Sequence, residues 1–307
     1  MRPLHPVSHA VRDRLAAAGL EPDAVADLVR ATVAEDLGGG DDVTSAATVP
    51  ADQRCTATFG ARAAGCVAGL HVAAAVLDVV CGADEVKFTA SVADGSRVSP
   101  GDVLASVSAP TRSLLTAERT ALNLLCHLSG VATATLRWVD AIEGTGAAVR
   151  DTRKTTPGLR SLEKYAVRCG GGQNHRMSLS DAALVKDNHI ASAGGVAEAF
   201  AKVRAAAAGL PIEIEVDTIE QLREAIAAGA DLVLLDNMAP DVLREAVRIC
   251  GEHRAVTGHE VLLEASGGLT LDNARAVAET GVHYVSVGAL THSSPILDIG
   301  LDVVSVD

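Results

Sequence analysis

Residues 211–237 read PIEIEVDTIEQLREAIAAGADLVLLDN, and this stretch decides the fold class. Two short β-like runs, at 211–216 and 232–236, flank a segment whose apolar residues recur at the spacing of a helix. A strand, a helix and a second strand in that order make a βαβ unit, in which the two strands lie parallel in one sheet. The stretch therefore predicts a parallel sheet with helices packed against it.

The same alternation repeats along the second half of the chain. Short β-like runs alternate with helical stretches, and the runs lie at 147–150, 182–185, 211–216, 232–236, 261–266 and 283–287. Six such units in so short a segment favour an α/β fold with a (β/α) barrel over an open sheet. A doubly wound open sheet is the alternative, although the glycine-rich dinucleotide fingerprint that usually follows its first strand is missing.

The first half of the chain has a different pattern. The first predicted helix begins at Pro22 and stops at Gly38, because proline favours the first turn of a helix and glycine its end. From 56 to 107 the sequence is mostly short alternating segments broken by glycine, which predict strands, with one helix at 71–82. This half therefore predicts a smaller domain of mixed helices and strands.

A long helix is predicted over 113–142 and joins the two parts. The chain has 307 residues, of which 48% are hydrophobic and 21% charged, so it is long enough and apolar enough for two globular domains. We expect an N-terminal domain over residues 1–125 and a catalytic barrel over residues 126–296.

The formal net charge of -13 argues against nucleic acid and membrane surfaces as partners, because both are polyanions. An anionic substrate would need a local cluster of cations. No apolar run reaches the roughly 20 residues that cross a bilayer, and residues 1–14 lack the apolar core of a signal peptide. The six cysteines form no CxxC pair, so we expect free thiols and a cytoplasmic protein.

Each of the six β-like runs ends in polar residues or glycines that a buried strand would not select for packing. They are Arg153 and Lys154; Lys186 with Asp187, Asn188 and His189; Glu215 and Asp217; Asp236 and Asn237; Ser266 with Gly267 and Gly268; and Ser286 and Gly288. In a barrel of parallel strands these ends converge on one rim, where such folds build their active sites. One such residue alone would be read as a loop charge or helix cap, but six sets in succession indicate a functional rim.

The residue types at this rim suit an anionic substrate and a divalent cation. The cationic donors are Arg153, Lys154, His175, Arg176 and Lys186. Together they fit a substrate with two carboxylates, or a phosphate and a pyrophosphate. Glu215 and Asp236 can share Mg²⁺, which takes few carboxylates and keeps its other positions for water and phosphates. The turn 266–268 opens a helix beside Gly288, and such a turn favours a phosphate.

Other polar residues have simpler interpretations. Lys186 is also a candidate Schiff-base lysine of an aldolase-type barrel, although the many cations nearby argue against this. Asp41 and Asp42 are interpreted as a turn and helix cap, and Cys169 shows no feature of a nucleophile. The remaining histidines that we interpret as surface or loop residues are His5, His9, His253, His259 and His292.

The motifs around this rim are similar to those of the quinolinate phosphoribosyltransferases. The resemblance rests on DTRKTTPGLRSLEKYAVRCGGGQNHRMSLSDAALVKDNHI (151–190), PIEIEVD, LVLLDNM, EASGGLTLDN and TGVHYVSVGALTHS. It extends to EDLGGGDDVTS (35–45) and ERTALNLLCHLSGVAT (118–133), so nearly the whole chain takes part. The sequence departs from the family pattern in the segment before residue 261, which carries a few extra residues near 251–260.

The resemblance implies an open or incomplete α/β barrel, an N-terminal α/β sandwich domain, and a tail at 297–307 that returns to that domain. It implies decarboxylating phosphoribosyl transfer from phosphoribosyl pyrophosphate to quinolinate, giving nicotinate mononucleotide, pyrophosphate and CO₂ in NAD biosynthesis, with Mg²⁺ as cofactor. It also implies at least a homodimer, because Arg119 matches an arginine that reaches into the neighbouring subunit's site.

The resemblance also implies a role for each rim residue. Arg153, His175, Arg176 and Lys186 would hold the quinolinate carboxylates, and Lys154 would lie near the pyrophosphate. Glu215 and Asp236 would bind the ribose hydroxyls and Mg²⁺, with Lys154 and Lys186 as further candidate catalytic groups. The 5′-phosphate would be bound by Ser266, Gly267, Gly268 and Gly288.

Three alternatives stay open at this point. The first is a related phosphoribosyltransferase that uses another aromatic acid, such as nicotinate, whose single carboxylate needs fewer cations. The second is the Schiff-base aldolase on Lys186. The third is a protein that binds a small anion without turnover, although the complete set of cations and acids disfavours it.

Overall fold

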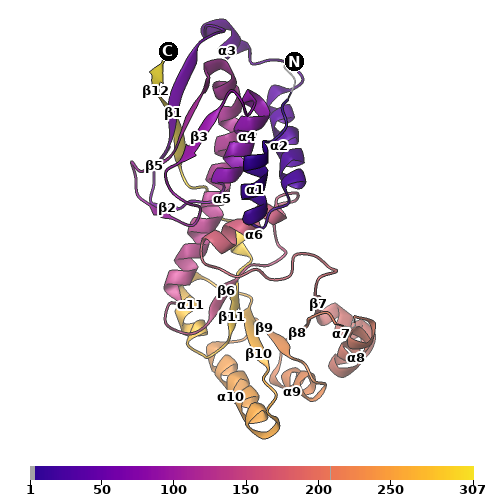
Figure 1. Cartoon of the computed structure of the whole chain (residues 1–307). Coiled ribbons are helices and arrows are strands. Elements are labelled where there is room, and N and C mark those ends of the chain that lie inside the picture. The colour runs from indigo at the N-terminus through magenta and orange to yellow at the C-terminus, as the bar shows by residue number, and fades with distance from the viewer. Residues whose placement is uncertain (1–3, 208) are drawn as a thin grey trace. The chain divides into compact units, whose positions relative to one another are not determined.

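The computed structural model describes residues 4–207 and 209–307, so residues 1–3 of the first predicted domain and residue 208 of the second lie outside the described residues. The chain divides into two compact units, and Figure 1 labels most of their elements. The N-terminal unit contains the described residues of Met1–Ala134, with Ser161–Gly170 and Ser293–Asp307. The barrel unit contains Thr135–Arg160 and the described residues of Gly171–His292.

The division between the units falls inside a single helix, α5 (Thr111–Ala141). The structure places it between Ala134 and Thr135 instead of between 125 and 126. Because α5 runs through both units as one continuous helix, no turn or change of periodicity marks the boundary in the sequence.

The N-terminal unit is built on an antiparallel sheet of four strands in the order β12-β1-β5-β3. These strands are β1 (Arg54–Ala61), β3 (Lys87–Ala90), β5 (Val103–Pro110) and β12 (Ile299–Val306). Strand β12 comes from the C-terminal tail and pairs with β1 from Cys55–Val306 to Ala61–Ile299. The two short strands β2 (Gly65–Cys66) and β4 (Arg97–Val98) form a separate ribbon.

Helices accompany this sheet, and α1, α2 and α4 pack against one another (Figure 1). The helices of this unit, besides α5, are α1 (His9–Ala17), α2 (Pro22–Leu37), α3 (Val43–Thr48), α4 (Leu70–Cys81) and α6 (Arg160–Cys169). Helix α6 lies in the sequence between barrel strands, yet residues 161–170 belong to the N-terminal unit. The unit is therefore assembled from three separate segments of the chain.

The helix predicted from Pro22 is confirmed as α2, with Pro22 in its first turn and Gly38 as a left-handed C-cap at φ 56°. The prediction that it is the first helix is wrong, because α1 precedes it. Helix α1 buries only Val11 and Leu15, so the sequence there carries little of the apolar periodicity that identifies a helix.

The barrel unit contains a parallel sheet of six strands in the order β6-β11-β10-β9-β8-β7. The strands are β6 (Ala148–Arg150), β7 (Ala183–Val185), β8 (Ile212–Val216), β9 (Leu232–Asp236), β10 (Leu262–Ser266) and β11 (Tyr284–Ser286). Each of the six β-like runs predicted from the sequence forms one of these strands. Since β6 and β7 are the two edges of the sheet, the prediction of an open barrel is confirmed.

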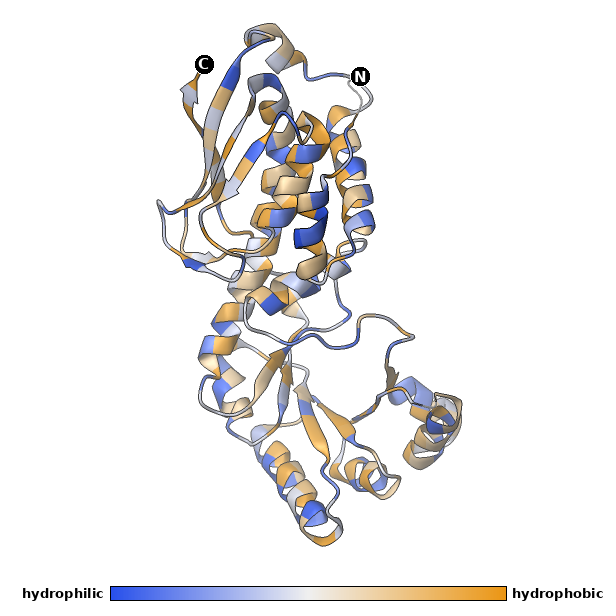
Figure 2. Cartoon of the chain, viewed as in Figure 1, coloured by the Kyte–Doolittle hydropathy of each residue, from blue (hydrophilic) through white to orange (hydrophobic). Residues whose placement is uncertain are grey.

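Helices follow the strands of this sheet, and α8, α9 and α11 contact strands directly. The helices of the barrel unit are α7 (Asp187–Ala193), α8 (Val196–Ala206), α9 (Ile219–Ala227), α10 (Pro240–Thr257), α11 (Leu271–Ala278) and α12 (Ala289–His292). One face of the sheet is buried and apolar, with Val149, Val185, Ile214, Val233, Leu235, Leu263, Ala265 and Val285. Figure 2 shows hydrophobic residues along these strands and alternating bands of polar and apolar residues on α10.

The segment 251–260, in which we expected extra residues relative to the family, is mostly helical. Residues 251–257 continue helix α10, which ends at the left-handed Gly258. Ion pairs between Arg248 and Glu252 and between Arg254 and Glu260 span this end of the helix. These residues therefore belong to a helix that ends on the side of the sheet opposite to the predicted rim.

Two predictions about cysteines and membranes can be compared with the structure. The six cysteines are free thiols, as predicted, and burial raises the pKa of the Cys169 thiol to about 12, which is inconsistent with an activated nucleophile. None of the helices in residues 4–207 and 209–307 has both the length and the apolar character of a membrane-spanning segment.

Candidate active site

Strand register places the polar strand residues together on the second face of the parallel sheet, which we call the inner face. Residues two apart on a strand point to the same side, and paired residues of neighbouring strands do so as well. By this register the inner face carries Arg150, Glu213, Glu215, Asp236, Glu264, Ser266, Tyr284 and Ser286. A barrel interior is usually filled by branched apolar side chains, so this polar face marks a functional site.

The positive and negative sides of the predicted rim meet at Lys186 and Glu215. The Lys186 Nζ lies 3.3 Å from a carboxylate oxygen of Glu215. Burial raises the pKa of Glu215 above its ordinary value, while the charge of Lys186 opposes the shift and the charge of Asp236 adds to it. Glu215 and Asp236 are thus close enough for their charges to interact, and both stand on the inner face.

Arg153 and Arg176 form the centre of the predicted cation cluster. Burial and the neighbouring charge of Arg153 lower the pKa of the Arg176 guanidinium, whereas the charge of Glu213 raises it. The Nε of Arg153 is buried and has no hydrogen-bond partner among residues 4–207 and 209–307. Two like charges this close favour an anionic ligand between or beside them.

His175 lies beside this cluster, but its ring is engaged within the protein. Its Nδ1 accepts a hydrogen bond from the backbone N–H of Arg176 at 2.7 Å, and its Nε2 lies 2.6 Å from a carboxylate oxygen of Glu213. Its own backbone N–H donates to Asp151 at 2.8 Å. Both ring nitrogens therefore have protein partners, so the expected role of His175 as a ligand of the substrate carboxylates has no free ring nitrogen to act through.

Two buried acids on the inner face, Glu213 and Glu264, were not among the predicted site residues. Glu264 is fully buried, contacts Arg150 at 2.5 Å, and accepts a hydrogen bond from Ser286. Burial, and then the charge of Glu213, raises the pKa of Glu264. Glu213 on β8 and Glu264 on β10 each lie two residues before a predicted rim residue, Glu215 and Ser266 respectively. Side chains two residues apart on a strand point to the same face, so this spacing would have identified both acids.

The turn after β10 has a backbone that another group can approach closely. Asn237 takes a left-handed conformation at φ 54°, donates its backbone N–H to Ser266, and lies against Gly267. Gly267 and Gly268 are left-handed too, at φ 85° and 61°. A Cβ built on Gly267 would collide with the side-chain amide of Asn237. Glycine is thus required at Gly267 both for its conformation and for space.

Helix α11 begins directly after this turn. Thr270 is its N-cap, and Thr270 and Asn273 form a reciprocal capping box. The structure therefore brings Ser266, Gly267 and Gly268 to the N-terminus of a helix, as the sequence predicted. Backbone N–H groups at such a position are suited to a phosphate.

Lys154 and Gly288 are brought together at the neighbouring strand ends. A Cβ on Gly288 would lie 3.0 Å from the Cδ of Lys154, so the absence of a side chain lets the lysine stem pass. The hydroxyl of Thr291 donates to the Lys154 carbonyl at 2.8 Å. The Lys154 side chain is exposed, which leaves its ammonium group available to a bound anion.

Arg119 belongs to the N-terminal unit and is the one predicted site residue outside the barrel unit. It lies on α5 and its side chain is exposed. One turn earlier on the same helix, the hydroxyl of Thr116 donates to Asp42 at 3.1 Å. Asp42 also caps α3, accepting from the backbone and hydroxyl of Ser45, so its interpretation as a helix cap is confirmed.

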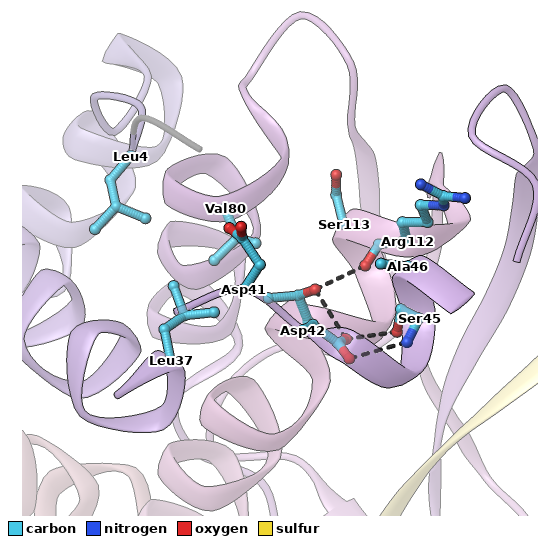
Figure 3. Close-up of a pocket in the computed structure, with 10 residues that line it drawn as sticks. Leu4, Leu37, Asp41, Asp42, Ser45, Ala46, Val80, Arg112 and Ser113 are labelled. Atoms are coloured by element: carbon cyan, nitrogen blue, oxygen red, sulfur yellow. Dashed lines mark hydrogen bonds between the residues drawn. The ribbon is translucent and has the colours of Figure 1, made fainter. Parts of the chain in front are cut away.

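Asp42 and Thr116 line a cavity of about 400 Å³ in the N-terminal unit. Figure 3 shows Asp41, Asp42 and Arg112 around it, with Leu4, Leu37 and Val80 on the apolar side. The cavity mixes acidic, basic and apolar groups, and the Asp42 carboxylate is already engaged by Ser45 and Thr116. Its lining does not match the predicted cation set, and we assign no substrate to it.

Two groups of carboxylates are candidates for holding a cation. Glu215 and Asp236 are partly accessible on the inner face and offer the hard oxygen ligands that Mg²⁺ prefers. The atoms of His175, Glu213 and Glu264 also lie within 4.8 Å of one another. In that second group, however, the Glu264 carboxylate already binds Arg150 and Ser286, and both ring nitrogens of His175 have protein partners. The donor set of Glu215 and Asp236 therefore fits Mg²⁺ better.

The chain matches two family models. Residues 42–129 match the N-terminal domain of quinolinate phosphoribosyl transferase, and residues 131–302 match its C-terminal domain. The two matches meet within α5, and together they cover most of the chain.

Individual proteins are similar along nearly the same length. A nicotinate-nucleotide pyrophosphorylase (carboxylating) of Mycobacterium leprae is 53% identical over 283 residues, covering 92% of this chain and 98% of that protein. A probable enzyme of the same name from Bacillus subtilis is 45% identical over 271 residues, covering 88% and 90%. The solved nicotinate-nucleotide pyrophosphorylase of Francisella tularensis superposes with a TM-score of 0.84 at 38% identity, covering 92% and 96%.

Proposed function

The chain belongs to the quinolinate phosphoribosyltransferase family, and from that membership we propose that it is a carboxylating nicotinate-nucleotide pyrophosphorylase. It transfers the phosphoribosyl group of phosphoribosyl pyrophosphate to quinolinate, releasing pyrophosphate and CO₂ and forming nicotinate mononucleotide for NAD biosynthesis. Support comes from relatives of this name that are 53% and 45% identical over most of the chain. The function classes considered as alternatives from sequence have no comparable support.

The observation that carries the proposal is the layout of the inner face. Arg153 and Arg176 are close enough for their charges to interact, and Lys186 contacts Glu215, whose charge interacts with that of Asp236. A dicarboxylate needs the first group, and a ribose with a divalent cation needs the second. The two substrates would thus meet where Lys186 contacts Glu215.

We assign the binding of quinolinate to Arg153, Arg176 and Lys186. Arginine can bind a carboxylate through two parallel hydrogen bonds, and the buried Nε of Arg153 still lacks an acceptor among the described residues. His175 is given a different part, because its ring nitrogens already bind Arg176 and Glu213. It supports the arginine and does not itself hold the substrate.

The binding of phosphoribosyl pyrophosphate is assigned to the other strand ends. Ser266, Gly267 and Gly268, with Gly288 in the next loop, present backbone N–H groups to the 5′-phosphate. Lys154 extends its ammonium group along Gly288 towards the pyrophosphate. Flexible lysine suits this position, since it acts as a point charge that follows the leaving group.

Glu215 and Asp236 would hold Mg²⁺ and the ribose hydroxyls. Their carboxylates are hard oxygen donors that face the same side of adjacent strands. When bound, the metal neutralises charge on the pyrophosphate. Glu215 also contacts Lys186, so the protein balances the charge of the acidic pair from the side of the pyridine ring.

The chemistry follows from positioning and electrostatics. The bond from ribose carbon 1 to pyrophosphate breaks, and Glu215 and Asp236 stabilise the positive charge that develops on the ribose. The quinolinate nitrogen, positioned by Arg153 and Arg176 through the ring carboxylates, forms the new bond to carbon 1. The carboxylate at ring carbon 2 then leaves as CO₂, and the electron pair left on that carbon is stabilised by the adjacent positive nitrogen until it takes a proton.

A second subunit completes the site in this proposal. Arg119 is exposed on α5 of the N-terminal unit, and family resemblance assigns it to the site of a neighbouring chain. The proposal therefore requires at least a homodimer, in which each barrel receives one arginine from its partner.

A Schiff-base aldolase is the alternative from another reaction class. Such a lysine must reach its neutral form to attack a carbonyl, usually by burial or beside another cation. Lys186 instead is half-exposed, and the neighbour that it contacts at 3.3 Å is a carboxylate. The geometry thus favours an anion-binding role for Lys186.

The proposed function is tested by measuring turnover with two different aromatic acids. The purified protein is incubated with phosphoribosyl pyrophosphate, Mg²⁺ and either quinolinate or nicotinate, and nicotinate mononucleotide is followed by chromatography. Product from quinolinate alone, lost when the metal is chelated, is the expected result. Product from nicotinate alone would keep the reaction class but overturn the assignment of the two-carboxylate pocket.

A further inference from the structure

We propose that Glu213 is a positioning residue for quinolinate binding, which acts through His175 to fix Arg176. The proposal rests on the function proposed above and adds a residue that touches neither substrate. The line of contacts runs from the Glu213 carboxylate to His175 Nε2 at 2.6 Å, and from His175 Nδ1 to the backbone N–H of Arg176 at 2.7 Å.

These two contacts define the tautomer of His175. The backbone N–H of Arg176 can only donate, so Nδ1 carries a lone pair and no proton. The ring proton of the neutral imidazole then lies on Nε2 and points at the Glu213 carboxylate, which can only accept when ionised. Glu213 thus selects the tautomer that allows His175 to accept from Arg176.

A second anchor holds the same turn from the other side. Asp151 is fully buried, and its two carboxylate oxygens accept from the His175 backbone N–H at 2.8 Å and from the Asn174 side chain at 2.6 Å. The guanidinium of Arg176 also donates to the Ala182 carbonyl at 3.1 Å. Residues 174–176 are therefore held by two acids. Asp151 binds the backbone of His175 and the side chain of Asn174, and Glu213 binds the ring of His175.

The position of Glu213 indicates that this acid serves function. It sits on the inner face of β8 and is 3% exposed, where barrels normally place branched apolar side chains. Burying a carboxylate costs free energy unless it is well paired, and the Oε1 of Glu213 has no hydrogen-bond partner in the part of the chain that the structure describes. Packing alone would favour an apolar residue here.

Glu264 lies near His175 but does not take the place of Glu213 as the partner of its ring. Its nearer oxygen lies 3.7 Å from His175 Nε2, beyond hydrogen-bond distance, and Arg150 and Ser286 already engage its carboxylate. Glu213 therefore makes the hydrogen-bond contact with His175 Nε2 that Glu264 is too far away to make.

The test compares Glu213→Ala with Glu213→Gln. Alanine removes the acceptor for His175 Nε2–H, whereas the glutamine amide oxygen can keep it. By analogy with the partners that orient metal-ligating histidines, Glu213→Ala should raise the KM for quinolinate by roughly 10- to 100-fold, with the KM for phosphoribosyl pyrophosphate little changed. Glu213→Gln should recover most of that loss. A purely structural role would change both KM values together, or would leave the glutamine variant as impaired as the alanine variant, and either outcome would overturn the proposal.

A second readout needs no turnover. In the wild-type protein, ¹⁵N NMR of the His175 ring should show a protonated Nε2 and an unprotonated Nδ1, and Glu213→Ala should lose this single tautomer. A protonated Nδ1 in the wild type contradicts the proposal. If the wild type showed the expected tautomer but formed no product, the proposed function would fail while the geometry held.

Asp231 provides a matched control. Its carboxylate accepts from His259 Nε2 at 2.8 Å, but at the opposite end of the sheet. Asp231→Ala should therefore leave both KM values unchanged. A quinolinate defect of equal size in this variant would show that loss of any histidine–carboxylate contact has the effect, which rules out a specific role for Glu213.

Discussion

The ammonium nitrogen of Lys186 lies 3.3 Å from a carboxylate oxygen of Glu215. This contact joins the cation cluster that we assign to quinolinate with the acidic pair that we assign to ribose and Mg²⁺. Substrates bound on both sides would draw the two side chains apart, each towards its own ligand. The free protein is thus neutralised internally at the place where the two substrates are proposed to react.

The first prediction concerns Arg153. Arg153→Ala should abolish measurable quinolinate binding, because it removes the guanidinium whose buried Nε lacks an acceptor among the described residues. Calorimetric titration with quinolinate measures this directly. Arg248→Ala, on the outer helix α10, is the control and should bind as the wild type does. Undiminished affinity in Arg153→Ala would rule out its assigned role.

Glu215 should give stability an unusual dependence on pH. Burial raises its pKa above the ordinary 4.5, so the folded state binds this proton more tightly than the unfolded state does. Its contribution to stability is present below pH 4.5 and is lost as pH rises through the raised pKa. Glu215→Gln, which stays neutral, should therefore gain stability relative to the wild type across that rise. Denaturant unfolding at several pH values measures the difference, and a constant difference would contradict the shift.

The glycine turn gives a prediction about phosphate binding. Gly267→Ala should raise the KM for phosphoribosyl pyrophosphate, since φ is 85° and the new Cβ would collide with Asn237. The unfavourable conformation alone costs about 1–2 kcal/mol. Gly251→Ala is the matched control, because it lies within α10 and, outside that helix, no described residue has an atom within 4 Å of its Cβ. It should add up to about 1 kcal/mol of stability. Equal KM values for both variants would contradict the assigned phosphate site.

The helix cap at Asp42 predicts a pH-dependent contribution to the N-terminal unit. Asp42→Ala should lower its unfolding free energy by about 1 kcal/mol, the usual value of an N-cap. Hydrogen bonds from Ser45 hold the pKa of Asp42 below its ordinary 3.8. The stabilisation is therefore complete above that value and is lost as pH falls through the lowered pKa. Thermal unfolding between neutral and acid pH measures it, and an unchanged difference at low pH would contradict the mechanism.

A shared site predicts complementation between inactive chains. Arg119→Ala and Lys186→Ala should each be inactive, and mixed dimers should recover activity, because one of their two sites receives neither substitution. Assays on dimers purified with two different tags measure this. No recovery in verified mixed dimers would count against the assignment of Arg119 to a neighbouring site.

Much of the fold could be predicted from sequence because its signals are local. All six barrel strands follow from short β-like runs, and α2 follows from Pro22 and Gly38 at its ends. Helix α1 was missed because only Val11 and Leu15 are buried, and the unit boundary could not be found within the uninterrupted α5.

The sequence predicts the residues at the rim of the candidate site, but it does not predict the buried acids on the inner face. Strand ends mark Arg153, Lys186 and Asp236 as a set, because parallel strands bring their ends together. Glu213 and Glu264 lie inside runs that were read as apolar strands, and their meaning depends on contacts with His175 and Arg150 that only the folded chain makes. For the same reason, the sequence could not show that the ring of His175 is occupied.

The most direct test of the account is the fate of one carboxylate. Quinolinate labelled in the carboxylate at ring carbon 2 is supplied with phosphoribosyl pyrophosphate and Mg²⁺, and labelled CO₂ and nicotinate mononucleotide are measured together. The account predicts one labelled CO₂ for each nicotinate mononucleotide, and none when phosphoribosyl pyrophosphate is omitted. A nucleotide product that retains the label, or CO₂ released without the second substrate, would contradict it.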